Sequence, residues 1–144
     1  MNDHQIKQKI KNLLEDHRLG VISTIDSEHD KPESALVAFA EKDDLSLIVG
    51  TSDFTRKYKN LQKNNRVSFV IGWSSETGSI QYEGEARELL DDEALKYGEL
   101  IVLKNNQAEK FAIQKNQRYF LVTPTWIRLV DTSLETGGNY EISF

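Results

Sequence analysis

The sequence has 144 residues, of which 38% are hydrophobic and 28% charged, and its formal net charge is −5 at pH 7. This composition is that of an ordinary globular chain long enough to bury a core, and it argues against disorder. The chain has no cysteine, which excludes disulfides, thiolate metal sites and cysteine nucleophiles. No apolar run approaches the roughly 18 residues needed to cross a membrane, and the N-terminus lacks the apolar segment of a signal peptide. We therefore expect one cytoplasmic domain over residues 1–144, with no membrane partner.

The first predicted element is a helix over residues 3–18. Ile6, Ile10, Leu13 and Leu14 recur at the spacing of one helical face. Gly20 then ends the helical pattern. This face is expected to pack against the remainder of the core.

Six strands are predicted after this helix, because short segments of alternating or β-branched residues are separated by turn formers. The expected strands are 19–25, 32–40, 45–51, 66–72, 79–89 and 118–131, the last being one long strand or two strands divided at Pro124. Gly84 in the fifth strand indicates a bulge or a close backbone approach. Short connections favour antiparallel pairing, and closure removes exposed edges, so we predict a mainly β fold with a six-stranded antiparallel barrel over about 19–131.

Three helical segments are predicted between or after these strands. They are a basic helix over 54–64, a helix over about 92–103 capped by Asp91, and a second piece near 107–114. The tail, residues 132–144, is expected to be loop-like.

The basic segment between residues 54 and 66 is the most informative part of the chain. It contains no acidic residue, so the rest of the chain carries −10, and its five basic residues are Arg56, Lys57, Lys59, Lys63 and Arg66. A small cationic patch in an acidic protein, at the start of a helix, favours a site for one anion such as phosphate. A solvated helix surface is the plain alternative. A nucleic-acid-binding module is disfavoured by the overall acidity and by the lack of interleaved aromatic residues beyond Phe54 and Tyr58.

Other catalytic signatures are absent from the sequence. It has no Gly-rich phosphate loop, and His4, His17 and His29 lack metal-ligand spacing, so no metal site is expected. Glu83 and Glu85 share one face of a strand, which is typical of a solvated surface. Because the chain carries little reactive chemistry, any redox or transfer activity would need a cofactor.

The order and spacing of these segments resemble the pyridoxamine 5′-phosphate oxidase-like family of FMN-binding split barrels. The segment TRKYKNLQKNNRVSF after a strand ending in Thr51, and the hairpin LGVISTI…KPESALVAF, carry the resemblance, which covers about residues 5–130. More narrowly, the chain is similar to the general stress protein 26-like branch. The resemblance implies an antiparallel split β-barrel that forms a homodimer and holds FMN between subunits.

The resemblance also implies a set of cofactor-binding residues. Arg56 and Lys57 would bind the flavin phosphate with help from Thr55, and charge-assisted bonds suit that task. Ser79 stands where the family often has a glutamine facing the ring. The other implied residues border the ribityl chain or the isoalloxazine: Leu36, Val37, Ala38, Thr51 and Trp73.

Two departures from the oxidases matter for function. Ala35 and Ala40 occupy places where the oxidases have an arginine and a lysine, so the implied phosphate site has fewer basic residues. The C-terminal Arg and His residues that hold pyridoxamine phosphate have no match here. We therefore expect an FMN-dependent oxidoreductase of another, unknown substrate rather than a pyridoxamine phosphate oxidase.

Alternatives to this function keep the same site. The chain could be a non-catalytic flavin carrier or a stress-response sensor, and its ligand could be FAD or the deazaflavin F420. The catalytic residues, the substrate and the electron donor cannot be read from the sequence.

Overall fold

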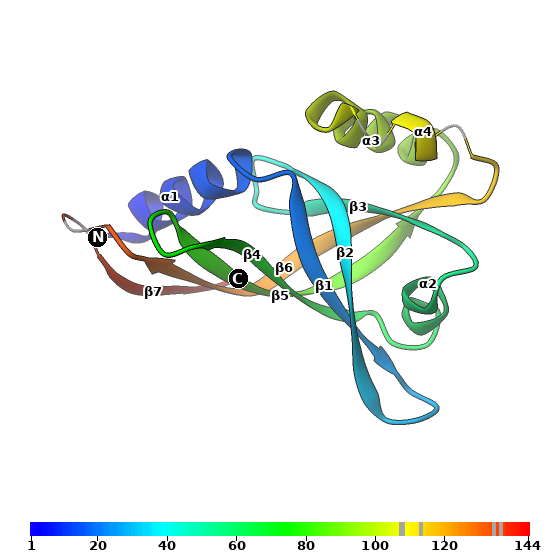
Figure 1. Cartoon of the computed structure of the whole chain (residues 1–144), viewed down its shortest axis with the longest axis horizontal. Coiled ribbons are helices and arrows are strands. Elements are labelled where there is room, and N and C mark those ends of the chain that lie inside the picture. The colour runs from blue at the N-terminus through cyan, green and yellow to red at the C-terminus, as the bar shows by residue number, and fades with distance from the viewer. Residues whose placement is uncertain (107–108, 113, 134, 136) are drawn as a thin grey trace.

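The computed structural model describes residues 1–106, 109–112, 114–133, 135 and 137–144, and these form one antiparallel sheet with short helices around it (Figure 1). The strands are β1 (Leu19–Asp26), β2 (Lys31–Glu41), β3 (Leu47–Ser52), β4 (Arg66–Ser74), β5 (Gly78–Leu89), β6 (Gln117–Asp131) and β7 (Gly138–Ser143). The helices are α1 (Asp3–Glu15), α2 (Arg56–Leu61), α3 (Asp91–Lys104) and α4 (Glu109–Ala112).

Six of the strands close into a barrel. The sheet order is β3-β2-β1-β4-β5-β6-β7, and β3 also pairs with β6, so the ring closes through β3 while β7 stays outside it. All of these pairings are antiparallel. The predicted mainly β, six-stranded antiparallel split barrel is therefore confirmed.

The barrel interior forms the larger hydrophobic core, because alternate residues of each strand point inward. α1 contributes Ile10 and Leu14 to this core, and both are fully buried. The helix ends at Glu15, before the predicted residue 18, because the chain must turn to enter β1 at Leu19. Fully buried side chains from the strands include Ile22, Phe39, Leu47, Ile71, Ile80, Val122 and Ile127.

Gly84 marks both a bulge and a close backbone approach, as predicted. The register between β5 and β6 shifts between Glu83 and Gly84, where Thr125 is the extra residue. A Cβ on Gly84 would lie 2.5 Å from the carbonyl oxygen of Thr123. The bulge lets β6 pass Pro124 as a single long strand.

A second, smaller core lies on the outer surface of the barrel beneath α3. Ala40, Ile48, Leu89 and Ile101 are buried there. Part of the barrel wall is therefore apolar on both faces, which fits the alternation-free sequence of β2. α3 lies over this part of the wall at the upper right of Figure 1.

Two local predictions were wrong. The tail is not loop-like over Gly138–Ser143, because this segment pairs with β6 and Ile142 is buried there. Asp91 does not cap α3: it is the first helical residue, at φ 51°, and Leu90 occupies the cap without a side-chain hydrogen bond. β5 runs to Leu89, which leaves a single residue for the turn. In the predicted helix 107–114, positions 107, 108 and 113 lie outside the described residues, and α4 covers part of the remainder.

Candidate functional site

The largest concentration of predicted site residues surrounds a pocket of about 330 Å³ on the outer side of the barrel wall. Its walls come from β2, the ends of β3 and α3, the beginnings of β6 and α2, and Leu19. The residues that line it are Leu19, Leu36, Val37, Ala38, Gly50, Thr51, Ser52, Thr55, Lys57, Ile101, Asn105, Gln117 and Tyr119. Pockets of roughly 300–1,000 Å³ are the usual size for small-molecule sites.

Six of the nine predicted cofactor-binding residues line this pocket: Leu36, Val37, Ala38, Thr51, Thr55 and Lys57. They come from residues 36–38 and 51–57, and the pairing of the consecutive strands β2 and β3 brings these segments together. Val37 is buried in the barrel, whereas the side chain of Leu36 is 61% exposed on the outer surface. The pocket is thus mostly apolar, with polar groups at one end.

Lys57 is the cationic group of the pocket. Burial lowers the pKa of its ammonium below the ordinary value, with no opposing contribution from a carboxylate. Among the residues that the structure describes, it has no hydrogen bond and no ion pair. A partly desolvated cation without a counter-charge favours an anionic ligand in the space it faces.

The two threonines beside Lys57 organise the polar end. Thr55 is the N-cap of α2, where its hydroxyl accepts from the Tyr58 N–H and donates to the Ser52 carbonyl at 2.9 Å. Its single proton is then used, so the 2.8 Å contact between Thr51 Oγ1 and Thr55 Oγ1 has Thr51 as the donor. Both hydroxyls hold the start of α2 against the end of β3. α2 has only six residues, shorter than the predicted helix over 54–64.

Tyr119 forms the wall opposite β2 and fits between two glycines. It pairs with Gly50 across β3 and β6. A Cβ on Gly50 would lie 3.1 Å from the Tyr119 ring, and one on Gly98 of α3 would lie 2.8 Å from it. Burial raises the pKa of the Tyr119 phenol, which is therefore neutral at pH 7.

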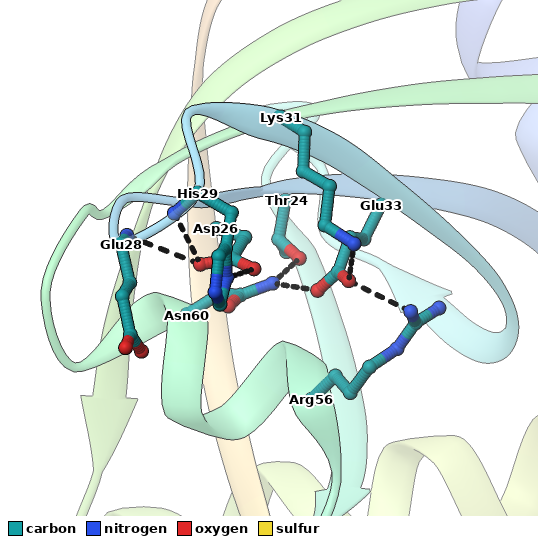
Figure 2. A network of polar contacts seen from close by, with 8 residues as sticks. All are labelled: Thr24, Asp26, Glu28, His29, Lys31, Glu33, Arg56 and Asn60. Carbon is teal, nitrogen blue, oxygen red and sulfur yellow. Dashed lines mark hydrogen bonds and ion pairs between the residues drawn. The ribbon is translucent and has the colours of Figure 1, made fainter.

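Arg56 lies outside this pocket, although it adjoins Lys57 in sequence. Its Nη1 donates to Glu33 Oε2 at 2.7 Å, and Lys31 Nζ lies 3.5 Å from the same oxygen (Figure 2). The other Glu33 oxygen accepts from Asn60 Nδ2 at 2.9 Å. These contacts hold the pKa of the Glu33 carboxyl below its ordinary value, the hydrogen bond from Asn60 being the largest cause.

The acidic tip of the β1–β2 hairpin lies against the basic face of α2. A separate hollow of about 130 Å³ is lined by acidic, basic and neutral polar residues: Asp26, Ser27, Glu28, His29, Glu33, Arg56, Lys59, Asn60 and Lys63. The carboxylate of Asp26 accepts hydrogen bonds from the His29 ring and from the backbone N–H groups of Glu28 and His29. Within the described residues, Arg56 is paired with Glu33, and Lys59 and Lys63 line the same hollow as acidic residues of the hairpin. This arrangement further disfavours a nucleic-acid footprint.

Trp73 and Ser79 do not line the pocket of this chain. Ser79 pairs with Val130, near the far end of β6 from Gln117 and Tyr119. The side chain of Trp73 is 57% exposed. Ala40, where the resemblance implies a basic residue in the oxidases, is buried beneath α3, where a charged side chain would be desolvated.

Seven pocket residues were not predicted from the sequence: Leu19, Gly50, Ser52, Ile101, Asn105, Gln117 and Tyr119. Gln117 and Tyr119 reach the pocket through the β3–β6 closure, and Ile101 and Asn105 through the packing of α3. The available signals in the sequence were Tyr119 near the beginning of a predicted strand and Gly98 within the predicted helix over 92–103.

The fold defines a split-barrel protein with a pocket on its wall that one lysine lines, and comparison with known proteins agrees with this fold class. A sequence model of the pyridoxamine 5′-phosphate oxidase family matches residues 6–131, so the chain belongs to this family. It is 32% identical over 76 residues to general stress protein 26 of Bacillus subtilis (strain 168), a stretch that covers 53% of this chain and 52% of that protein. The chain spans about half or less of the curated relatives it matches.

Solved structures show the same fold. General Stress Protein 26 from Bacillus anthracis str. Sterne superposes with a TM-score of 0.75 at 23% identity, covering 96% of this chain and 99% of that one. A heme binding protein from Mycobacterium smegmatis gives a TM-score of 0.81 at 14% identity, covering 95% of this chain and 57% of that one. Among the described residues, no helix is both long enough and apolar enough to span a bilayer.

Proposed function

We propose that this protein binds FMN in the pocket beside Lys57, with the phosphate at Lys57 and the ring along the apolar wall formed by β2 and Tyr119. The observation that carries the proposal is the partly buried Lys57 ammonium, which lacks an anionic partner among the described residues and lines the pocket. A phosphate would supply the missing counter-charge. Leu36, Ala38 and Ile101 offer the apolar surface that a flat ring requires.

We also propose that the functional unit is a homodimer. Leu36, Val21 and Val70 lie side by side across β2, β1 and β4 on the outside of the barrel. Leu36 and Val70 are 61% and 45% exposed. Because Leu36 also lines the pocket, a second copy covering this row would close the pocket at the same time. Ser79 and Trp73, which lie away from the pocket of their own chain, would be available to the pocket of the partner.

Bound FMN supplies hydride chemistry at the flavin N5. The residues of this chain would bind the phosphate, exclude water from the ring and orient a substrate, and the substrate stays unassigned. An FMN-dependent oxidoreductase is the leading role, and a flavin carrier or stress-response sensor is the alternative. Reduction of the bound flavin by NADH or NADPH, followed by reoxidation by an added acceptor, would favour the enzyme.

The direct test is titration of the purified protein with FMN, followed by flavin fluorescence. We expect saturable quenching at one flavin per chain, and weaker binding of riboflavin, which lacks the phosphate. FAD, F420 and heme serve as competing ligands in the same titration. Tighter binding of heme than of FMN, or equal affinity for FMN and riboflavin, would contradict the proposal.

The dimer is tested separately by light scattering of Val70→Lys. We expect this variant to be monomeric and to bind FMN more weakly, although residue 70 is outside the pocket. Leu95→Lys is the matched control, because Leu95 is 71% exposed on α3, away from the β1–β2–β4 row. A Val70→Lys protein that remains dimeric would place the contact elsewhere.

A further inference from the structure

Arg56 and Lys57 are adjacent in sequence but face different surroundings. Lys57 lines the 330 Å³ pocket, whereas Arg56 lines the smaller hollow beneath the β1–β2 hairpin. The side chain of Arg56 is 69% exposed, and its contact to Glu33 is the only hydrogen bond that the described residues make with its guanidinium. A guanidinium has five N–H donors, so most of its donor capacity is free for another acceptor.

Glu33 is held far more firmly than the arginine it binds. Its side chain is only 8% exposed. Asn60, itself buried, donates from Nδ2 to Thr24 Oγ1 and to Glu33 Oε1, each at 2.9 Å. This bridge fixes the carboxylate so that Oε2 faces Arg56 and Lys31, as Figure 2 shows. The carboxylate is therefore a firmly held acceptor, and Arg56 is the exposed member of the pair, with fewer contacts.

We propose that Glu33 sets the affinity of the pocket for phosphorylated ligands by competing with the ligand phosphate for Arg56. This inference rests on the proposed function, because it assumes a phosphate beside Lys57. Arg56 follows Thr55, which lines the pocket, so a long flexible side chain at position 56 can serve either acceptor. While Glu33 is ionised it retains Arg56 and leaves the phosphate with one cation. Without that charge the phosphate would gain a second, bidentate cation.

Glu33 is thus a residue that determines specificity through Arg56 and does not itself touch the ligand. It should change the preference for FMN over riboflavin, because only FMN carries the phosphate. It should leave the affinity for the ring unchanged. The ligand class affected includes any compound with a phosphate monoester at that end of the pocket.

The test is Glu33→Gln, with FMN and riboflavin titrated in parallel at low salt. Glutamine keeps an oxygen that can accept from Asn60, so the bridge to Thr24 is retained. We expect FMN affinity to rise about two- to fivefold, the range expected for an exposed ion pair, and riboflavin affinity to stay the same. Added salt should reduce the difference.

Two further variants separate release of Arg56 from a general change of charge. Glu28→Gln removes the same charge from the same hairpin, but the Glu28 side chain points away from Arg56 in Figure 2, so it should leave FMN affinity within the error of wild type. In the Glu33→Gln background, Arg56→Gln should abolish the gain, whereas in wild type it should have a smaller effect.

Each outcome is decisive. An unchanged ratio of FMN to riboflavin affinity in a folded Glu33→Gln protein, or a gain that survives Arg56→Gln, would overturn the role of Glu33 while leaving the FMN site intact. Wild-type protein that binds FMN no better than riboflavin would instead overturn the proposed phosphate site. If Glu33→Gln did not fold, Arg56→Gln in wild type would decide: a loss of FMN affinity as large as that of Lys57→Gln would show that Glu33 does not retain Arg56.

Discussion

Lys57→Gln is the substitution that tests the proposed site most directly, because it should act in opposite directions on ligand binding and on folding. Lys57 is partly buried without a counter-charge among the described residues. In the ligand-free protein its charge is desolvated at a cost, which a neutral glutamine of similar length avoids. In the complex the same charge would form a hydrogen bond to phosphate, which glutamine replaces poorly.

The expected loss of FMN affinity follows from the strength of such a bond. A hydrogen bond to a charged group contributes about 1.5–3 kcal/mol, which corresponds to about 10- to 150-fold in Kd. Riboflavin affinity should change less than twofold. The unfolding midpoint of the ligand-free variant should be equal to or above that of wild type.

The pH dependence gives the same reasoning a second readout. Because the folded pKa of Lys57 is lowered, the unfolded chain binds more protons between that value and 10.5, and stability from this group rises with pH in that window. Lys57→Gln should remove this rise, as measured by urea unfolding at a series of pH values.

The matched control is Lys59→Gln, which removes a charge from the same helix at a residue that lines the other hollow. It should alter FMN affinity by less than twofold. The reasoning would be refuted if the two variants lost equal affinity, or if Lys57→Gln weakened FMN and riboflavin alike.

Three other predictions concern the fold and the hairpin network. Ile142→Ala should lower the free energy of unfolding by about 2–4 kcal/mol, because the Ile142 side chain extends from β7 into the core and is only 4% exposed. An unchanged urea midpoint would contradict the β7 pairing. Gly84→Ala should cost about 1–3 kcal/mol by the same measurement, since its Cβ would lie 2.5 Å from a backbone oxygen of Thr123 that cannot rotate away. Glu33 has a folded pKa below its ordinary 4.5, so its contribution to stability is present above pH 4.5 and is lost as pH falls through the folded pKa. Glu33→Gln should therefore reduce the loss of stability on the acid side, measured by urea unfolding at a series of pH values. Parallel stability curves for wild type and variant would contradict this.

The parts of the site that sequence reasoning reached are those set by local order. Thr51, Thr55 and Lys57 lie within one strand-to-helix connection, so a strand end and a helix start were enough to group them. Leu36 and Ala38 were implied by the family resemblance, and the β2–β3 pairing places them beside these residues. Short alternating or β-branched segments between turn formers likewise predicted the barrel strands.

The features of the site that were not predicted from the sequence depend on contacts between segments distant in the chain. Nothing in the local sequence says that Arg56 faces Glu33 while Lys57 faces the pocket, because this depends on where the β1–β2 hairpin lies over α2. Tyr119 enters the site through the β3–β6 closure, which follows from the barrel as a whole. β7 was missed because Tyr140 and Ile142 are too short an alternation to outweigh the turn residues before them.

The fit of the Tyr119 ring between Gly50 and Gly98 has an evolutionary consequence. Gly50 of β3, Gly98 of α3 and the Tyr119 ring occupy one small volume. A larger side chain at one of these positions therefore requires a smaller one at another. Relatives with a side chain larger than hydrogen at position 50 or 98 should therefore carry a smaller residue at position 119. The three positions should covary as a set, and their combination should mark the branches of the family whose pockets differ in shape.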